Sequence, residues 1–214
     1  LGLVYLPVES ATGDRYGADR PGNNLFANSL VALDIATGER KWHYQIIHHD
    51  IWDWDNPSAP ILADLPNGKK VIMQVTKQSY VYTFDRENGE PIWLIEELPV
   101  PAGDVPGEWY APTQPFPTKP AGFDRQGFTE DDLIDFTPEL REKALLAVAD
   151  FRLSPSLYSP PSLKDAADGT KGTLSLPSAT GGANWEGSAI DPETGMLYIP
   201  SRTTISVLSV EKDE

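Results

Sequence analysis

The sequence predicts an all-β fold in which short antiparallel strands are joined by tight turns. Its 214 residues include 17 glycines and 20 prolines, and such frequent turn-forming residues interrupt helices and favour many short strands. Hydrophobic residues make up 40% of the chain and aromatic residues 10%, which is enough to build a core and too much for a disordered chain. A turn pattern that recurs along the chain supports the same fold class.

The recurring pattern is an Asp followed by a Gly four residues later and by a Trp eight residues later. Its two copies are Asp34, Gly38 and Trp42, and Asp85, Gly89 and Trp93. Because an apolar strand precedes each Asp, each copy predicts a hairpin in which the Asp begins the turn and the Gly takes a positive φ. The Trp is expected to close over the turn or to pack on the neighbouring sheet. A third, weaker copy without the Trp runs from 188 to 198.

A repeat of about 50 residues in strand-and-turn sequence is typical of propeller blades with four strands each. The chain would then hold three to four blades, which is too few to close a ring. A sandwich made of ordinary hairpins is the alternative interpretation. The sequence therefore predicts a partial β-propeller, with blades over 1–96 and further blade strands over 161–214.

A proline-rich and helical insertion is expected between these parts, around residues 97–160. Seven prolines between 99 and 120 predict extended, irregular chain there. Thr137 as N-cap, Pro138 at the first helical position and apolar residues at helical spacing then predict a helix over 138–152. Decoration of the β scaffold is the simplest role for the insertion, and covering a site or docking a partner is the alternative.

The charge and cysteine content exclude several classes of function. With 17 Lys and Arg against 32 Asp and Glu, the formal net charge is −15, so no basic stripe is available to bind nucleic acid through its phosphates. The absence of cysteine rules out disulfides, thiolate metal sites and a cysteine nucleophile. No apolar run approaches 18 residues, so no transmembrane segment is predicted in this stretch.

Both ends of the sequence have the character of strands within a longer protein. Residues 1–7 are strand-like from the first position, and the apolar run 205–210 stops at four charged residues. We therefore expect the chain to be a fragment, and an isolated fragment of this kind to be inactive.

The densest group of chemically capable side chains is the segment His48–Pro57, with three carboxylates, two imidazoles and two indoles. Strand alternation would place Asp53 and Asp55 on one face together with Ile51, and the two tryptophans on the other face. Carboxylates beside indoles can hold a divalent cation or act as a base next to an apolar ligand. An acidic loop whose tryptophans belong to the core is the structural alternative.

Two further segments could carry chemistry. Lys77 lies between two apolar strand-like stretches, where an exposed surface lysine is the alternative. The segment Gly181–Gly187 combines glycines, which allow a close approach of the backbone, with an Asn amide and a Trp ring; a tight loop between blades is the alternative. For His48 and His49 we expect structural hydrogen bonds, because they lack the i, i+4 spacing of a helical zinc site.

Taken together, these residues resemble the quinoprotein dehydrogenases that use pyrroloquinoline quinone (PQQ), especially their glucose dehydrogenase branch. The similarity runs in order along essentially the whole chain. It is carried by Leu30–Trp42, His48–Asp55, Thr76–Gln78, Phe84–Pro91, Thr113–Phe116 and Gly182–Trp185. The Trp-Asp-x-Asp block followed by a lysine is the most specific part, whereas the Asp-Gly-Trp turn is shared with propellers that are not enzymes.

The resemblance implies an eight-bladed propeller with PQQ near its axis and a divalent ion, usually Ca2+, on the carboxylate and quinone edge of the cofactor. Asp53 corresponds to the base that takes the proton of the substrate hydroxyl, and to a ligand of the ion. Lys77 corresponds to the cation that hydrogen-bonds the quinone oxygens and stabilises negative charge there. Asn184 corresponds to a cofactor contact, and Trp185 to a residue lining the same pocket.

The resemblance also implies partners and a compartment. The substrate would be a small sugar or alcohol, the electrons would pass to a quinone or a cytochrome, and the protein would be periplasmic or secreted. One departure concerns the metal: relatives commonly have an Asn ligand just after the strand that matches residues 4–7, and this sequence has none there. Glu9 is the acidic residue in that stretch.

Two other classes of function remain open at this point. A non-catalytic propeller of the same ancestry, acting as a binding or assembly scaffold, would take up no cofactor and would tolerate loss of Lys77. A protein that binds or cleaves carbohydrate would use paired acids and tryptophans. Asp53 and Asp55 on one strand face would lie ~6–7 Å apart, but no second acidic strand is evident.

Overall fold

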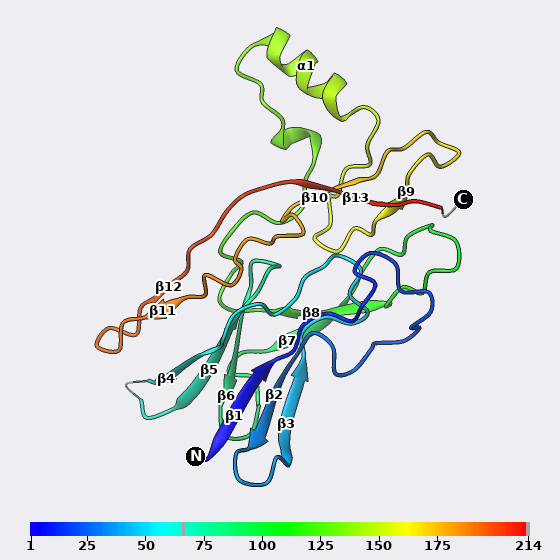
Figure 1. The fold of residues 1–214 in the computed structure, drawn as a ribbon. Helices are drawn as coiled ribbons and strands as arrows, with labels where there is room; N and C mark the ends of the chain where they lie inside the picture. The colour runs from blue at the N-terminus through cyan, green and yellow to red at the C-terminus, as the bar shows by residue number, and fades with distance from the viewer. Residues whose placement is uncertain (66, 213–214) are drawn as a thin grey trace.

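The computed structural model describes residues 1–65 and 67–212, which form five small sheets with few helical residues (Figure 1). The first two sheets are antiparallel and each has three strands, which follow one another in sequence order. They are β1 (Leu3–Pro7), β2 (Ser29–Asp34) and β3 (Arg40–Gln45), then β4 (Ile61–Asp64), β5 (Lys70–Val75) and β6 (Val81–Asp85). Each sheet is thus a blade-like unit, with three strands in place of the four expected per blade.

All three predicted hairpin turns are present and share one geometry. In the first, the Asp34 carboxylate accepts the backbone N–H groups of Ala36 and Thr37, both at 3.0 Å. Gly38 has φ +73° and donates its N–H to the Asp34 carbonyl at 2.8 Å. The turns that begin at Asp85 and Asp191 repeat this arrangement, with Gly89 at φ +80° and Gly195 at φ +72°. The turns therefore follow from local chemistry, because the Asp side chain satisfies turn N–H groups and the Gly accepts a left-handed backbone.

Trp42 packs on the turn of the next repeat, which is the second of its two expected arrangements. A Cβ atom added to Gly89 would lie 2.7 Å from the Trp42 ring, and the indole Nε1 donates to the carbonyl of Arg86 at 3.3 Å. This contact ties the β1–β3 sheet to the β4–β6 sheet. Trp93, the corresponding residue of the second repeat, is 40% exposed, and Gly195 of the third turn has no atom near the position of a Cβ.

The proline-rich segment contains a strand pair, which differs from the irregular chain that the sequence predicted. Strands β7 (Ile95–Pro99) and β8 (Thr113–Pro117) form an antiparallel ribbon. In its register Pro117 faces Ile95, Pro115 faces Glu97 and Pro99 faces Thr113. All three prolines therefore occupy alternate pairs of the ladder, where a missing N–H can point away from the partner strand. The ribbon is fixed to the β4–β6 sheet by Tyr82, whose hydroxyl donates to the Pro115 carbonyl at 2.7 Å.

The C-terminal part carries the helical insertion and the remaining strands. It contains η1 (Glu130–Asp132), α1 (Pro138–Val148), β9 (Ser162–Leu163), β10 (Thr173–Ser175), β11 (Ala189–Ile190), β12 (Leu197–Tyr198) and β13 (Ser206–Val210). Strand β13 lies between β10, with which it is antiparallel, and β9, with which it is parallel. Helix α1 projects away from the sheets (Figure 1) and buries none of its side chains.

Helix α1 begins as predicted and ends four residues earlier than predicted. Thr137 caps it by accepting the N–H of Leu140 at 3.3 Å. Beyond Val148 the backbone turns toward β10, because Arg152 donates its N–H to the Gly172 carbonyl at 3.0 Å and forms a parallel bridge with Thr173. The pairing of this backbone with β10 therefore ends the helix. No helix of the described part of the chain is both long and apolar enough to cross a membrane.

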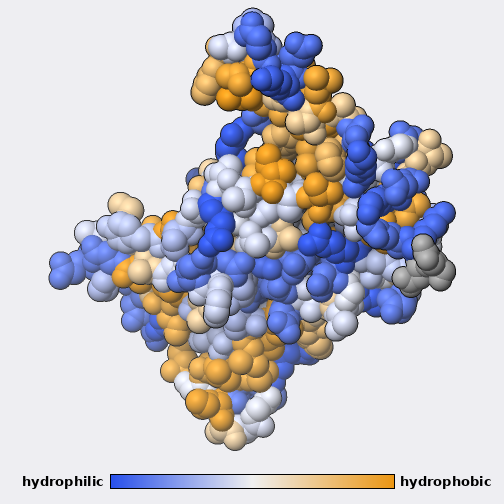
Figure 2. Space-filling model, turned by 45° about the horizontal axis from the view of Figure 1, so that its top comes forward, coloured by the Kyte–Doolittle hydropathy of each residue, from blue (hydrophilic) through white to orange (hydrophobic). Residues whose placement is uncertain are grey.

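The main core lies between the first two sheets and extends to the segment that follows β3. Its largest buried side chains come from the inner faces of both sheets and from the C-terminal part, and they include Leu30, Ile72, Tyr82, Phe84, Trp54, Tyr158 and Leu208. Figure 2 shows apolar side chains at the lower end of the molecule, the end where β1–β3 lie in Figure 1. Leu1, Val4, Leu6 and Ile35 are among the exposed apolar residues of this region.

Candidate active site

The segment that follows β3 is irregular, so the prediction of a strand there is wrong, although the two tryptophans are separated from the carboxylates as that strand would have required. Asp53 has φ +63°, a left-handed conformation that no strand can contain. The indoles of Trp52 and Trp54 are nevertheless buried and stacked, with ring centroids 5.6 Å apart, and Tyr158 packs against both rings. Ile51, which was expected beside the carboxylates, is instead buried in the core.

Lys77 and the two acids that precede it in sequence meet in one place. Lys77 lies in the turn between β5 and β6 and is only 5% exposed. Its Nζ is 2.7 Å from the backbone carbonyl of Asp53, 3.3 Å from the Asp53 carboxylate and 2.9 Å from the Asp55 carboxylate. These three oxygens match the three N–H donors of an ammonium group. The alternative of a surface lysine is thereby excluded.

Asp55 is the more strongly held of the two acids. One of its oxygens accepts both the backbone N–H and the hydroxyl of Ser10, at 2.8 Å and 2.7 Å, and the other accepts Lys77. Burial alone would raise the pKa of Asp55, but the Ser10 hydrogen bonds and the Lys77 ammonium lower that pKa to about 2. Asp55 is therefore a permanent anion. The sequence marked Asp55 only as a possible partner of Asp53 in a carboxylate pair, and its contact with Ser10 was not predicted, because Ser10 is distant in sequence and carries no recognisable motif.

The environment of Asp53 differs from that of Asp55. Burial is the largest influence and raises the pKa of Asp53, the Lys77 ammonium opposes that change, and the nearby negative charge of Asp55 adds to it. Among residues 1–65 and 67–212, the Asp53 carboxylate makes one polar contact, the 3.3 Å approach of Lys77. A half-buried carboxylate with a raised pKa and few hydrogen bonds is suited to accept a proton.

A fully buried carboxylate organises the backbone around Asp53. Asp50 accepts the N–H of Trp52 and the N–H of Trp54, both at 2.8 Å, and the side-chain amide of Asn28 at 2.9 Å. Its burial raises its pKa to about 6, against the effect of these three donors. Asp50 is one of the three carboxylates marked in His48–Pro57, but its contact with Asn28 was not predicted, since only the fold brings the two together.

The loop Gly181–Gly187 is packed directly on Lys77. Gly181 has φ +79°, and a Cβ added to it would lie 2.5 Å from the Cβ of Lys77. Gly182 donates its N–H to the Lys77 carbonyl at 2.9 Å. The glycines thus allow a close approach of two protein segments, rather than the direct approach to a ligand that the sequence suggested.

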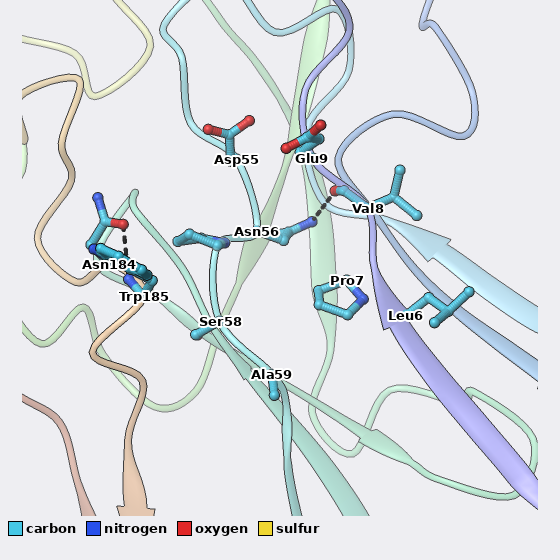
Figure 3. A pocket seen from close by; sticks show the side chains of 11 residues that line it. Leu6, Pro7, Val8, Glu9, Asp55, Asn56, Ser58, Ala59, Asn184 and Trp185 are labelled. Atoms are coloured by element: carbon cyan, nitrogen blue, oxygen red, sulfur yellow. Dashed lines mark hydrogen bonds between the residues drawn. The ribbon is translucent and has the colours of Figure 1, made fainter.

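Asn184 and Trp185 lie at the rim of a cavity. The Asn184 amide donates to the Thr180 carbonyl at 2.7 Å and accepts the N–H of Trp185 at 2.8 Å, which fixes the loop. Trp185 itself is 81% exposed. Figure 3 shows Asn184 and Trp185 on one side of the cavity, and Glu9 and Asp55 on the other.

This cavity has a volume of about 770 Å³ and is bounded by the end of β1, the segment Asp55–Ala59 and the Asn184 loop. Asp53 and Lys77 do not line it. Asp55 lines it and also contacts Lys77, so Asp55 joins the buried ion pairs to the open cavity. The four residues singled out from the sequence thus fall into two neighbouring groups, namely Asp53 with Lys77 and Asn184 with Trp185.

His48 and His49 make the structural hydrogen bonds that were expected. The imidazole of His49 is buried and lies 2.8 Å from the Gly22 carbonyl and 3.0 Å from the carboxylate of Glu108. His48 lies between the side chains of Gln45 and Glu97, at 2.8 Å and 3.0 Å. Both rings therefore hold neighbouring segments together.

The described residues do not by themselves assemble a metal centre. Within 1–65 and 67–212, no group of three or more His, Cys, Asp or Glu side chains is arranged to hold a metal ion. Glu9, which stands where the resemblance implies an Asn ligand, faces the cavity beside Asp55 (Figure 3). The role of Asp53 as a metal ligand remains a prediction.

Comparison with known proteins places this geometry in a family. The probable quinate dehydrogenase (quinone) of Xanthomonas campestris pv. juglandis is 34% identical over 203 residues, which are 92% of this chain and 25% of that protein. The quinoprotein glucose dehydrogenase of Escherichia coli is 36% identical over 203 residues, covering 90% of this chain and 24% of the relative. The chain thus spans about a quarter of the length of the curated relatives it matches.

A solved structure supports the same fold. The quinohemoprotein alcohol dehydrogenase of Comamonas testosteroni superposes with a TM-score of 0.55 at 24% identity, over 95% of this chain and 24% of that one. All 214 residues match the family described as "PQQ: Glucose/ethanol/alcohol dehydrogenase, beta-propeller domain". The partial propeller predicted from the turn repeats is therefore confirmed, and the chain belongs to this family of PQQ-dependent dehydrogenase β-propeller domains.

Proposed function

We propose that this chain is part of a longer PQQ-dependent dehydrogenase that oxidises a hydroxyl group of a small sugar or alcohol. The observation that carries the proposal is the contact between Lys77 and Asp53, in which a buried ammonium lies beside a half-buried carboxylate. Family membership supports the general chemistry. The two relatives named above are a probable quinate dehydrogenase and a glucose dehydrogenase, and quinate and glucose each have hydroxyl groups that can be oxidised.

Asp53 is assigned the role of general base. Oxidation of an alcohol to a carbonyl removes a hydroxyl proton and a hydride, and the proton needs an acceptor within hydrogen-bond reach. Asp53 has few hydrogen bonds and a pKa raised by burial, so its carboxylate is available for that proton. When bound, PQQ supplies the acceptor for the hydride.

Lys77 is assigned the role of a cation that stabilises negative charge on the quinone oxygens. Its Nζ donors are already matched by three oxygens, and the longest of these contacts is the 3.3 Å approach to the Asp53 carboxylate. That contact is the easiest to exchange for another acceptor. Its exchange would also release the Asp53 carboxylate for proton transfer, so both proposed roles are served by one rearrangement.

The residues present fit part of a PQQ site. The cavity of about 770 Å³ has the exposed Trp185 ring and the Asn184 amide on one side and the Asp55 carboxylate on the other. An exposed indole can stack on a flat ring system, and Asn184 can offer a polar contact. For the divalent ion, Asp53 is the proposed ligand and Ca2+ the proposed metal. The described residues contribute an incomplete donor set, so further ligands would have to come from outside this stretch.

Electron acceptor and compartment complete the proposal. We assign a quinone or a cytochrome as the acceptor, and a periplasmic or secreted location, on the strength of the family resemblance. The word "quinone" in the description of the Xanthomonas relative is in line with the first acceptor. Neither a nucleic acid nor a membrane-spanning role is proposed for these 214 residues.

The test uses the full-length protein, loaded with PQQ and Ca2+ and assayed by reduction of an acceptor dye with glucose, quinate, glycerol and ethanol. We expect Asp53→Asn to lower kcat by ~10²–10⁴-fold, and Lys77→Ala to lower it by ~10²–10³-fold. Asp64→Asn is the control, because Asp64 pairs with Arg86 on the surface, 68% exposed and away from the cavity. An unchanged rate in Asp53→Asn would reject the assignment.

The same preparation separates the other classes of function. A non-catalytic scaffold would bind no PQQ and would tolerate Lys77→Ala. A glycoside-cleaving protein would release free sugar without reducing the dye. The contact of Lys77 with both acids argues against the second of these, since an ammonium between two carboxylates holds them away from a bound glycosidic bond.

A further inference from the structure

We infer that Asp50 is the positioning residue of this site: its buried carboxylate holds the backbone on both sides of Asp53, and so sets how Asp53 faces Lys77. The inference rests on the proposed function for its consequence in catalysis. That Asp50 holds the backbone around Asp53 does not depend on the proposed function, and the experiment below tests this claim separately from the effect on catalysis.

Asp50 forms hydrogen bonds to the backbone on both sides of Asp53. Trp52 and Trp54 flank Asp53, and the backbone N–H of each donates to a different oxygen of Asp50, both at 2.8 Å. A single rigid carboxylate therefore fixes two peptide groups that lie two residues apart. Hydrogen bonds to a charged acceptor are the stronger kind in proteins, and both of these are fully buried.

These bonds enforce an unusual backbone conformation at Asp53. Asp53 has φ +63°, and for residues other than glycine this left-handed region costs ~1–2 kcal/mol. Such a conformation persists when the surroundings over-determine it. The two hydrogen bonds to Asp50 provide that constraint, one on each side of the strained residue.

This conformation brings Asp53 to Lys77. Lys77 contacts Asp53 through both its carbonyl and its carboxylate, at 2.7 Å and 3.3 Å. Main-chain and side-chain oxygens of one residue converge on one ammonium only when the backbone turns them to the same side. In an extended backbone, the carbonyl of a residue lies along the in-plane hydrogen-bonding direction while its side chain projects out of that plane.

Asp50 is itself held in place by its neighbours. Asn28 donates its side-chain amide to Asp50 at 2.9 Å and to the Trp54 carbonyl at 3.1 Å, while Arg20 donates to the backbone carbonyl of Asp50 at 2.7 Å. Among the described residues no cation contacts the Asp50 carboxylate. The carboxylate is thus used entirely to hold N–H groups, which is the function of a positioning residue and not of an ion pair.

The experiment is a double-mutant cycle in the full-length protein, read by hydrogen exchange in peptides that cover residues 51–56. Asp50→Asn preserves shape but leaves one carbonyl oxygen where two were needed, so these amides should exchange about tenfold faster or more. In the Asp53→Gly background the increase should be several-fold smaller, because glycine adopts a positive φ without a constraint. Asp64→Gly is the matched control background, since Asp64 has no positive φ and pairs with Arg86 and not with a residue of the site, and there the full increase should remain.

Catalysis provides the second reading. In the loaded enzyme, Asp50→Asn should lower kcat by ~10-fold or more with little change in KM, because displacement of a catalytic group by about 1 Å can cost up to 10²-fold. If Asp50→Asn does not fold, Asn28→Gly is the substitute. It removes both side-chain hydrogen bonds and tolerates the φ of +49° found at that position.

Two results would overturn the inference. Equal acceleration of exchange by Asp50→Asn in the Asp53→Gly and Asp64→Gly backgrounds would mean that Asp50 supports the fold without acting on Asp53. A rise of KM with unchanged kcat would mean that it acts on binding. If the wild-type enzyme oxidises none of the substrates, the proposed function fails, and the exchange cycle still decides whether Asp50 positions Asp53.

Discussion

Replacing Asp55 by Asn tests whether the ion pair with Lys77 stabilises the site. The pKa of Asp55 falls from an ordinary value of 3.8 to about 2. Since each tenfold change in an acid constant corresponds to ~1.4 kcal/mol, the ionised form is favoured by ~2 kcal/mol in the folded state. Asn keeps an oxygen but has no charge, so it weakens both Ser10 hydrogen bonds, which lower the pKa most, and it leaves Lys77, whose side chain is only 6% exposed, without this counter-charge. We therefore expect ~2 kcal/mol of local stability to be lost.

Hydrogen exchange of the segments 53–55 and 76–79 in the full-length protein measures this loss directly, because local opening limits exchange there. A loss of ~2 kcal/mol corresponds to exchange about 30-fold faster. Asp64→Asn is the matched control, because it removes the same charge from a pair with Arg86 in which the Asp64 carboxylate is 68% exposed, and solvent screening of an exposed charge keeps such a contribution at ~0–1 kcal/mol.

The pH dependence of stability gives an independent check that the charge of Asp55 stabilises the folded state. The folded-state pKa of Asp55 is depressed, so its stabilisation is fully present above pH 3.8 and is lost as the pH falls through about 2. Wild type and Asp55→Asn should therefore differ by a constant amount between pH 5 and 7 and converge in strong acid. If Asp55→Asn exchanged no faster than Asp64→Asn at pH 7, the reasoning about the buried ion pair would be refuted.

Three further predictions concern turns and buried polar groups. In urea unfolding, Gly89→Ala should lower the stability of the protein more than Gly195→Ala does. Both glycines have a positive φ, which costs alanine ~1–2 kcal/mol. Only at Gly89 would the new Cβ also meet an indole ring, at 2.7 Å. Glu108→Gln should lower the free energy of unfolding by ~1–3 kcal/mol, because it weakens a buried contact with His49. Since the pKa of Glu108 is lowered from 4.5, this loss of stability relative to wild type should shrink as the pH falls below that value. Ser79→Gly should raise the urea midpoint, because Ser79 combines φ +71° with a buried hydroxyl that has no hydrogen-bond partner in the described part of the chain; a lower midpoint would contradict this.

The parts of the fold that could be predicted are those that local chemistry decides. Each Asp–Gly turn is closed by hydrogen bonds within five residues, so the sequence pattern is sufficient to identify it. The start of helix α1 is likewise set by Thr137 and Pro138. The end of the helix depends on pairing with β10, which is more than 20 residues away, and the sequence pattern does not contain that information.

The strand β8 was missed for a related reason. Prolines are ordinarily evidence against a strand, but those at 115 and 117 occupy alternate positions of a two-stranded ribbon, where one edge of each strand is free. Proline content predicts irregular chain only if the spacing of the prolines is ignored. A spacing of two residues is compatible with a ribbon, and this signal was available in the sequence.

The candidate site shows where residue types suffice and where they do not. Asp53 and Lys77 could be found because an acid and a lysine occupy the positions of a known motif, and they prove to be in contact. Asp50, Asn28 and Ser10 hold these groups in place through hydrogen bonds that span up to 45 residues of sequence. Asn28 and Ser10 have no distinctive neighbours, and Asp50 lies in the marked segment His48–Pro57 without a role that its residue type reveals.

The contact of Asp53 with Lys77 depends on backbone conformations that the sequence does not indicate. Asp53 and Ser79 both have positive φ, at +63° and +71°, although neither is glycine. Gly181, at φ +79°, allows the third segment to close on Lys77. The site is thus formed by three left-handed turns, of which only one is marked by a glycine. A strand over residues 51–55 would also keep the two acids on one face. Only the turn at Asp53, however, brings both the carbonyl and the carboxylate of this residue to the Lys77 ammonium. A substitution that relaxes this turn should therefore disturb the site without removing any of its functional groups.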